Sequence, residues 1–229
     1  MRQKRTRKTK TKTDRLLYLN DPKSAFAEAY RTLRTNIRYS TVNRELRTLM
    51  ITSSAAGEGK TTTAANLALA MAQEGQRVLL IDGDLRHPSL HRFFSISNEV
   101  GLTDLLIRTQ EAGAVIRRFP KAGLDVITAG GLPPNPAELL GSERMGELLR
   151  QFHGEYDIVL LDSPPILPVT DGQLLSRLVD GVLLVLRAGE VRREHAKKAK
   201  HLLNHVGANV IGAVLNGKKL DLSTYEYRE

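Results

Sequence analysis

A glycine-rich turn followed by a lysine and two threonines constrains this chain more than any other stretch. Residues 53–62 read Ser-Ser-Ala-Ala-Gly-Glu-Gly-Lys-Thr-Thr. Gly57 and Gly59 let the backbone wrap around a phosphate chain, with N–H groups and a helix N-terminus pointing at it. Lys60 can then reach the outer phosphates, and the hydroxyl of Thr61 can bind Mg²⁺. The segment therefore predicts a strand before it, a helix after it and a nucleotide at the turn.

The residues expected to contact ATP in this turn are Gly57, Glu58, Gly59, Lys60, Thr61 and Thr62. Ser54 stands where the usual phosphate-loop pattern has its first glycine.

The rest of the chain alternates between short apolar runs and amphipathic segments. Strands are predicted near residues 48–52, 77–81, 124–128, 157–161, 181–186 and 210–215, and helices near 60–74, 136–152, 171–178 and 192–206. Short, nearly continuous apolar strands between helices are typical of a parallel sheet covered on both faces. The predicted fold is thus α/β, a parallel β-sheet of the P-loop NTPase type, with its ligand beyond the carboxyl ends of the strands.

Three aspartates follow predicted strands at that edge of the sheet. Asp82 and Asp84 stand two residues apart after one strand, and Asp162 follows four apolar residues of another. Such carboxylates can hold the Mg²⁺ shell, and one can accept a proton from an attacking hydroxyl. An aspartate at the end of a strand is otherwise a turn former or a helix cap. Their common position beside the phosphate loop favours the metal and catalytic roles.

Two features near the end of the chain allow more than one interpretation. Asn216 ends the last predicted strand, where its amide can read the adenine edge or simply form a turn. His201 and His205 are four residues apart on a predicted helix, a spacing that permits metal binding, but the sequence offers no third ligand.

An amphipathic helix is predicted from about residue 23 to 43. Phe26, Tyr30, Leu33 and Ile37 fall within one stripe at 100° per residue and are expected to form its buried face. The polar residues Glu28, Arg31 and Arg34 project together on another face. They form either an ordinary exposed face with a Glu–Arg pair or a docking face for another subunit.

The positive charge is concentrated at the N-terminus. Residues 1–15 carry eight basic residues and one acid, which leaves 26 basic and 24 acidic residues in the remainder. We expect three parts: a basic tail over residues 1–20, one domain over 21–220 and a short polar tail over 221–229. The basic tail is either a solubilising extension or a segment attracted to an anionic membrane surface. No nucleic acid is expected as a partner, because no aromatic residue interleaves the charges.

The chain has no cysteine, which excludes disulfides and thiolate metal sites. No apolar run is long enough to span a bilayer, and the N-terminus lacks the apolar core of a signal peptide. We therefore expect a cytoplasmic protein that reaches a membrane through its surface or a partner. The polar C-terminal tail carries Tyr225 and Tyr227, which are either part of an ordinary chain end or phosphoacceptors that enter a neighbouring active site.

Together these motifs resemble the bacterial tyrosine autokinases of capsule and exopolysaccharide synthesis, from about Ser24 to the C-terminus. Asp82, Asp84 and Arg86 match the family's Asp-x-Asp-x-Arg motif, and residues 162–165 match its Asp-Ser/Thr-Pro-Pro motif. Residues 28, 31 and 34 match its Glu-x-x-Arg-x-x-Arg oligomerisation motif. The family's tyrosine cluster is usually richer than the two tyrosines here, and the basic N-terminus lies outside its pattern.

The resemblance implies an ATP- and Mg²⁺-dependent protein-tyrosine kinase, active on the inner face of the plasma membrane. Lys60 would bind phosphates, Thr61, Asp84 and Asp162 would serve Mg²⁺, and Asp82 would help to activate the tyrosine hydroxyl. It also implies a ring in which each subunit offers its C-terminal tyrosines to its neighbour. The implied partners are the cytoplasmic tail of a transmembrane adaptor and a tyrosine phosphatase.

Two other functions compete with this one. A positioning or partition ATPase of the same fold would carry an early lysine in its phosphate loop, and Ala55 stands in that place. A nucleotide-gated, non-catalytic scaffold of a polysaccharide export complex would not need Lys60 and the three aspartates. The fate of the phosphate of ATP distinguishes the three.

Overall fold

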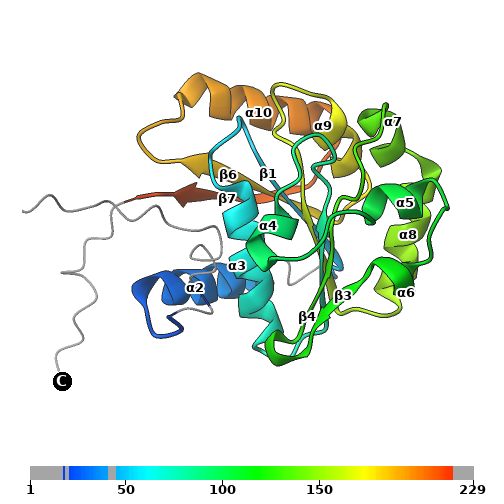
Figure 1. Ribbon diagram of the computed structural model, residues 1–229. Coiled ribbons are helices and arrows are strands. Elements are labelled where there is room, and N and C mark those ends of the chain that lie inside the picture. The colour runs from blue at the N-terminus through cyan, green and yellow to red at the C-terminus, as the bar shows by residue number, and fades with distance from the viewer. Residues whose placement is uncertain (1–17, 19–20, 41–44, 219–229) are drawn as a thin grey trace, which may run out of the picture.

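The computed structural model describes residues 18, 21–40 and 45–218, and Figure 1 shows their arrangement. The strands are β1 Thr48–Ser53, β2 Val78–Asp82, β3 Arg117–Phe119, β4 Leu124–Ile127, β5 Ile158–Asp162, β6 Gly181–Arg187 and β7 Val210–Asn216. The helices include α2 Ala25–Ser40, α3 Lys60–Ala72, α4 Leu90–Phe94, α5 Leu102–Leu106, α6 Ala112–Val115, the 3-10 turn η2 Pro120–Ala122, α7 Pro136–Leu140, α8 Glu143–His153, α9 Asp171–Ser176 and α10 Arg193–His205.

The seven strands form one sheet in the order β3-β4-β2-β5-β1-β6-β7. All neighbouring pairs are parallel except β3 with β4. The strand β1 lies between β5 and β6, so the turn that follows it stands near the middle of the sheet. The predicted parallel α/β architecture is confirmed.

Alternate residues of each central strand face two separate cores. In β1, Leu49 and Ile51 belong to a core shared with α2, α3 and α4, whereas Met50 belongs to one shared with α5 to α10. Helices cover both faces of the sheet in Figure 1 as well. Burial on both faces explains why the strands read as continuous apolar runs instead of alternating ones.

One predicted helix was wrong, and several short elements were not predicted. The helix expected at 136–152 is two helices, because Gly141 and Ser142 interrupt it and the Ser142 hydroxyl caps α8 by accepting from the N–H of Met145. The antiparallel edge strand β3 was not predicted from the sequence. The short helices α4, α5 and α6, each five residues or fewer, were missed because so few turns show no periodicity.

The packing face of α2 is rotated from the predicted stripe. Ile37 is buried and Tyr30 and Leu33 pack against the core, but Phe26 is 55% exposed. Ala27 is buried, and its small side chain permits a close approach to the neighbouring layer. The Arg34 guanidinium also turns inward, donating to the carbonyl of Ala70 at 2.6 Å. Because of these contacts, the buried face of α2 does not include Phe26.

The helix α3 is enclosed by the rest of the domain, and every residue in it except Thr62 is buried. Tyr18, which falls in the predicted basic tail, is also buried, and its N–H donates to the Asn66 side chain on α3 at 2.9 Å. The guanidinium of Arg31 lies over the Tyr18 ring, 5.5 Å from its centre. Within the described residues, no helix is long and apolar enough to cross a bilayer.

Candidate active site

The glycine-rich turn connects β1 to α3 as predicted, and both of its glycines adopt positive φ angles. The angle is 86° at Gly57 and 95° at Gly59, a region that side chains disfavour. A Cβ on Gly59 would also lie 1.9 Å from the Asn216 side-chain nitrogen. That nitrogen donates to the carbonyl of Glu58 at 3.0 Å, so a hydrogen bond connects the end of β7 to the turn. Only glycine fits at position 59.

Ser54, the departure from the usual glycine pattern, has a structural partner. Its N–H and its hydroxyl both donate to the carboxylate of Glu58, at 2.8 and 2.7 Å. Glu58 is 5% exposed. The serine hydroxyl therefore satisfies a buried carboxylate inside the turn, which a glycine at the same position would leave with one donor fewer.

Lys60, the first residue of α3, points at the carboxylates from the neighbouring strands. Its ammonium lies 2.8 Å from Asp84 Oδ2 and 3.7 Å from Asp162 Oδ1. Burial lowers the pKa of Lys60, but the charges of Asp162 and Asp84 outweigh it, and the pKa rises above its ordinary value. Lys60 is therefore a permanent cation at this edge of the sheet.

Asp82 is fully buried at the end of β2, and both of its oxygens are occupied. Oδ2 accepts the backbone N–H groups of Ser89 and Leu90, each at 2.9 Å, and Oδ1 accepts that of Asp84 at 3.2 Å. Burial and the nearby charge of Asp162 raise the pKa of Asp82 to about 7, although those backbone donors oppose the rise. A carboxyl with this pKa exchanges protons near neutral pH.

Asp162 ends β5 opposite Asp82 and is fully buried. Among the described residues, neither of its oxygens accepts a well-formed hydrogen bond, although Lys60 and Thr61 lie nearby. Burial raises its pKa, against the opposing charge of Lys60. Three buried carboxylates thus face one lysine. Unsatisfied buried oxygens and an excess of negative charge suit a hard divalent cation, so the donor set fits Mg²⁺.

The segment after β2 contains Arg86, which the sequence singled out, and its contacts include Ser89 and Asp171, which the sequence did not single out. Ser89 donates its hydroxyl to that of Thr61 at 3.0 Å, which ties this segment to α3. Arg86 makes two hydrogen bonds, of 2.8 and 3.0 Å, to Asp171 at the start of α9. Asp171 is fully buried, so the pair fixes the segment against the neighbouring layer. In the sequence, Asp171 stands at the start of a predicted helix and so resembles a helix cap, and its pairing with Arg86 could not be predicted.

Other predicted residues lie away from this cluster. On α2, Glu28 pairs with Arg31 at 2.7 Å as the spacing predicts, whereas Arg34 pairs with Glu74 at 3.1 Å and is only 17% exposed. Arg34 therefore makes contacts within the domain, and its place in an oligomerisation face with Glu28 and Arg31 stays a prediction.

The two remaining predictions concern the end of the chain. Tyr225 and Tyr227 lie outside the described residues. His201 and His205 stack with their ring centres 6.4 Å apart, and within the described residues no third side chain joins the two histidines in a metal-binding group.

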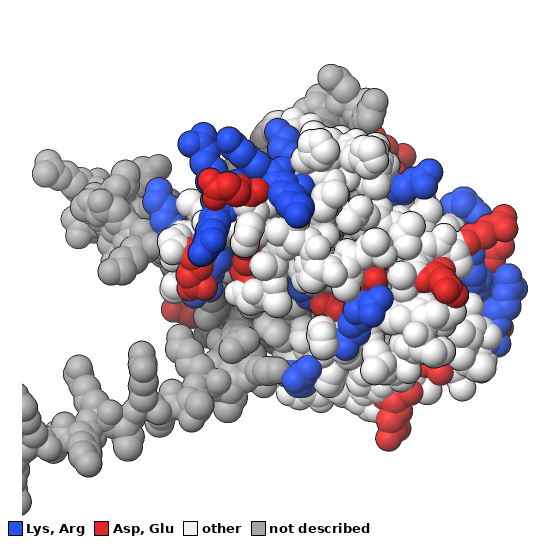
Figure 2. All heavy atoms as spheres, turned by 90° about the horizontal axis from the view of Figure 1, so that it is seen from above, with Lys and Arg blue, Asp and Glu red and all other residues white. Residues whose placement is uncertain are grey.

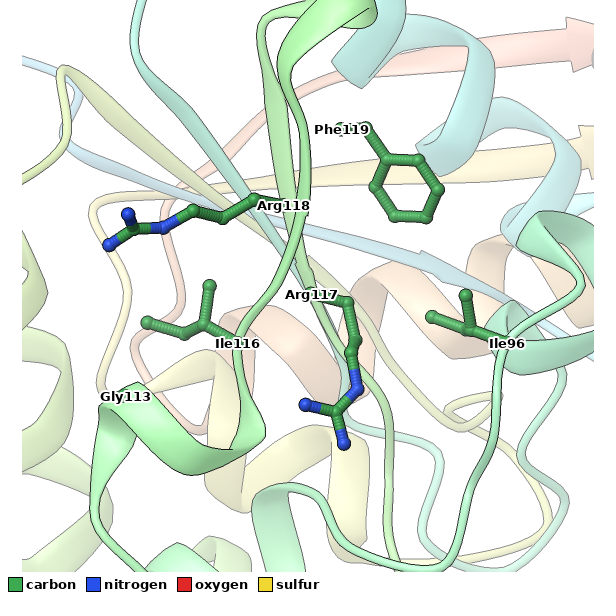
Figure 3. A pocket seen from close by; sticks show the side chains of 6 residues that line it. All are labelled: Ile96, Gly113, Ile116, Arg117, Arg118 and Phe119. Atoms are coloured by element: carbon green, nitrogen blue, oxygen red, sulfur yellow. The ribbon is translucent and has the colours of Figure 1, made fainter.

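A separate hollow of about 590 Å³ opens at the β3 edge of the sheet. Figure 3 shows the side chains that line it, Ile96, Gly113, Ile116, Arg117, Arg118 and Phe119. The strand β4 separates β3 from β2 and its catalytic segment. This hollow is therefore not the phosphate site.

Comparison with known proteins shows the same family across nearly the whole chain. The family model described as AAA domain matches residues 46–204. The tyrosine-protein kinase YwqD of Bacillus subtilis is 46% identical over 213 residues, covering 93% of this chain and 90% of that one. The putative tyrosine-protein kinase CapB of Staphylococcus aureus is 39% identical, covering 92% and 93%. The tyrosine-protein kinase etk of Escherichia coli is 40% identical, but this chain spans only 30% of its length.

Solved structures agree with these relatives. The chimerical protein CapA2B2 superposes with a TM-score of 0.87 at 37% identity, over 90% of this chain and 91% of that one. The kinase domain of Escherichia coli ETK gives 0.85 at 37% identity, over 99% and 89%. A cell division ATPase MinD from Pyrococcus furiosus gives 0.63 at 25% identity. With the glycine turn, the paired strand-end aspartates and these likenesses in agreement, the chain belongs to the bacterial tyrosine-protein kinases, within the AAA domain family.

Proposed function

We propose that this kinase transfers the γ-phosphoryl group of ATP to Tyr225 and Tyr227 of a neighbouring copy of the chain. The observation that carries the proposal is the buried cluster in which Lys60 faces Asp82, Asp84 and Asp162. Charge stabilisation and positioning are the main requirements of phosphoryl transfer, and this cluster provides both.

The turn at residues 57–62 binds the phosphates of ATP through its backbone N–H groups, and Lys60 offsets their charge. Thr61, Asp84 and Asp162 hold Mg²⁺, which when bound neutralises charge on the phosphates. Asn216 borders the turn and contacts the adenine with whichever part of its amide the bond to Glu58 leaves available.

In the chemical step the tyrosine oxygen bonds to the γ-phosphorus as the bond to the β,γ-bridging oxygen breaks and ADP leaves. The tyrosine proton passes to Asp82, whose pKa of about 7 makes it a competent base at neutral pH. Asp84 is held by Lys60 and by the N–H of His87 at 3.0 Å, which suits it to the metal. If Asp82→Ala retains full phosphotransfer while Asp84→Ala loses it, the assignment of the base is wrong.

Incubation with ATP and Mg²⁺ followed by phosphotyrosine detection tests the proposal. Wild type, Lys60→Met and the double variant Tyr225→Phe/Tyr227→Phe are compared, with and without a candidate adaptor tail. Signal in wild type that both variants lose supports a kinase with acceptors at its C-terminus. Release of free phosphate without phosphotyrosine would instead indicate an ATPase.

We also propose that the chain works at the inner face of the plasma membrane in polysaccharide synthesis, as a ring activated by the tail of a transmembrane adaptor and reversed by a tyrosine phosphatase. A relative from Klebsiella pneumoniae is named as a putative tyrosine-protein kinase in cps region, which supports the setting. Glu28 and Arg31 are accessible on α2 for contacts within the ring, and Arg34 holds α2 in place.

Sedimentation tests the ring. Glu28→Ala/Arg31→Ala should dissociate the oligomer and lower the melting temperature only slightly, through the loss of the exposed Glu28–Arg31 pair and of the Arg31–Tyr18 contact. Arg34→Ala should lower that temperature more, because its contacts with Ala70 and Glu74 are more buried. An intact oligomer in the first variant would remove Glu28 and Arg31 from the interface.

A further inference from the structure

The helix α10 presents a row of basic side chains that have no acidic partner in the described part of the chain. The helix packs through Ala199 and Leu203. Beside that buried side, Arg193, Lys197 and Lys200 are exposed at a spacing of four and three residues, which aligns them along one face. We call these three residues the α10 basic face.

Charge on the surrounding surface is mixed. Seen from above, on the side where α10 lies in Figure 1, Figure 2 shows Lys and Arg side chains gathered toward one side, with acidic side chains between some of them. Like charges three and four residues apart on a helix repel one another. A bound anion would relieve that repulsion, so this face is suited to an acidic ligand.

The C-terminal segment leaves the domain at the same end of the sheet where α10 begins. The helix follows β6, and β7 runs parallel to β6 back to that end. There the N–H of Ala188 donates to the carbonyl of Asn216 at 2.8 Å. Residues 217–229 therefore start beside the first turn of α10.

The length of this segment suffices to reach the whole basic face. Tyr225 is nine residues beyond Asn216, which allows a span of about 30 Å when extended. The 13 residues of α10 are only about 20 Å long. Either acceptor tyrosine can thus lie against any of the three basic residues.

We propose that the α10 basic face binds residues 217–229 of this chain once Tyr225 and Tyr227 are phosphorylated. The inference rests on the proposed function, which makes these tyrosines acceptors. Before modification, the segment's side chains are balanced, with Lys218, Lys219 and Arg228 against Asp221, Glu226 and Glu229. Each phosphate adds a charge of about −1.5 to −2 and three acceptor oxygens, so only the modified segment is strongly attracted.

This binding would give phosphorylation a direct structural consequence. A modified segment bound along α10 cannot at the same time occupy the active site of a neighbouring copy, which is left to an unmodified segment. The basic face would then act as a product site that favours successive transfers over rebinding of phosphorylated tyrosine.

Fluorescence anisotropy with a synthetic peptide of residues 217–229 tests the proposal. The peptide is prepared with both tyrosines phosphorylated and with neither, and is added to full-length Tyr225→Phe/Tyr227→Phe protein, whose own segment cannot be modified. The test variant adds Arg193→Gln/Lys197→Gln/Lys200→Gln. The control adds Arg108→Gln/Arg117→Gln/Arg118→Gln, which removes three positive charges around α6 and β3, of which Arg108 and Arg118 are exposed and Arg117 is half-buried. Circular dichroism melts confirm that both variants fold.

We expect the phosphorylated peptide to bind at least tenfold more tightly than the unmodified one, and the α10 variant to lose at least tenfold of that affinity. The control should stay within twofold of the parent. Equal losses in both variants, or loss on Lys60→Met instead, would overturn the proposal. So would an α10 variant that still binds the peptide but no longer binds phosphatidylglycerol vesicles, because the face would then be a membrane surface.

The result does not depend on the kinase reaction, because the phosphates are introduced by synthesis. Peptide binding without autophosphorylation would refute the proposed acceptors and leave the docking site in place. Autophosphorylation without peptide binding to α10 would refute the docking site and leave the proposed acceptors in place.

Discussion

Replacing Asp82 with asparagine should stabilise the nucleotide-free protein, and increasingly so as the pH rises. The folded state keeps the Asp82 carboxyl protonated up to a pKa of about 7, against 3.8 in an unfolded chain. A raised pKa in the folded state contributes stability that is complete below the unfolded pKa and is lost as the pH rises through the folded one. Asparagine keeps the acceptor for Ser89 and Leu90 but has no charge to bury.

The two pKa values determine the size of the effect. Linkage between them gives a penalty on wild type of about 1.7 kcal/mol at pH 5 and about 4.3 kcal/mol at pH 8. The asparagine amide also loses the hydrogen bond from Asp84, which subtracts about 1 kcal/mol at every pH. The advantage of Asp82→Asn should therefore grow by about 2–3 kcal/mol from pH 5 to pH 8. For a domain of this size that corresponds to about 5–10 °C in melting temperature.

Thermal melts between pH 5 and pH 8.5, with EDTA and no nucleotide, measure this growth. The control is Asp157→Asn, whose exposed carboxylate has its pKa lowered by hydrogen bonds from Arg77. Asp157 is ionised in both states throughout this range, so its variant should be destabilised by the same amount at every pH. If the stability difference between Asp82→Asn and wild type is also independent of pH, burial does not keep the Asp82 carboxyl neutral.

Three further substitutions test other parts of the structure. Gly59→Ala should weaken nucleotide binding at least tenfold in titration calorimetry. Adding Asn216→Ala to the same chain should restore only part of that affinity, because the positive φ at position 59 remains. Full restoration would show that only the clash with the Asn216 side chain mattered. Tyr18→Ala should lower the free energy of unfolding in urea by about 3 kcal/mol through the cavity it leaves, and an unchanged midpoint would place Tyr18 outside the core. Arg86→Ala should cost about 2–3 kcal/mol by leaving buried Asp171 unpaired, and Asp171→Asn should recover much of it; additive losses in this cycle would show that the two residues are not coupled.

The sequence was most informative where function and fold depend on the same local chemistry. Gly59 has to be glycine for its backbone angle and for its clearance from Asn216, so the turn can be recognised without any tertiary information. The strand-end positions of Asp82 and Asp162 follow from apolar runs that end in a carboxylate, and the parallel register then aligns them. That part of the site could be predicted because it depends on the order of elements alone.

The remainder depends on contacts between distant segments. Nothing in the neighbourhood of Phe26 shows that Arg34 will reach Ala70 and turn the helix. Likewise, the charged Arg117 and Arg118 do not indicate that residues 117–119 pair antiparallel with β4. Tyr18 is buried beneath Arg31. Its neighbours Leu17 and Leu19 are apolar, but so short an apolar run beside a basic segment does not show which part of the domain it packs against. Tertiary packing decided each of these cases.

The enclosure of α3 divides the active site into a fixed wall and an adjustable one. Helix and phosphate turn are surrounded by both the sheet and α2, so they keep their position relative to the core whatever occupies the site. The opposite wall consists of residues 83–89 and the Asn216 side chain, which are attached through side-chain hydrogen bonds and ion pairs. We therefore expect any adjustment to a bound ligand in that second wall, whose contacts are weaker than the packing around α3.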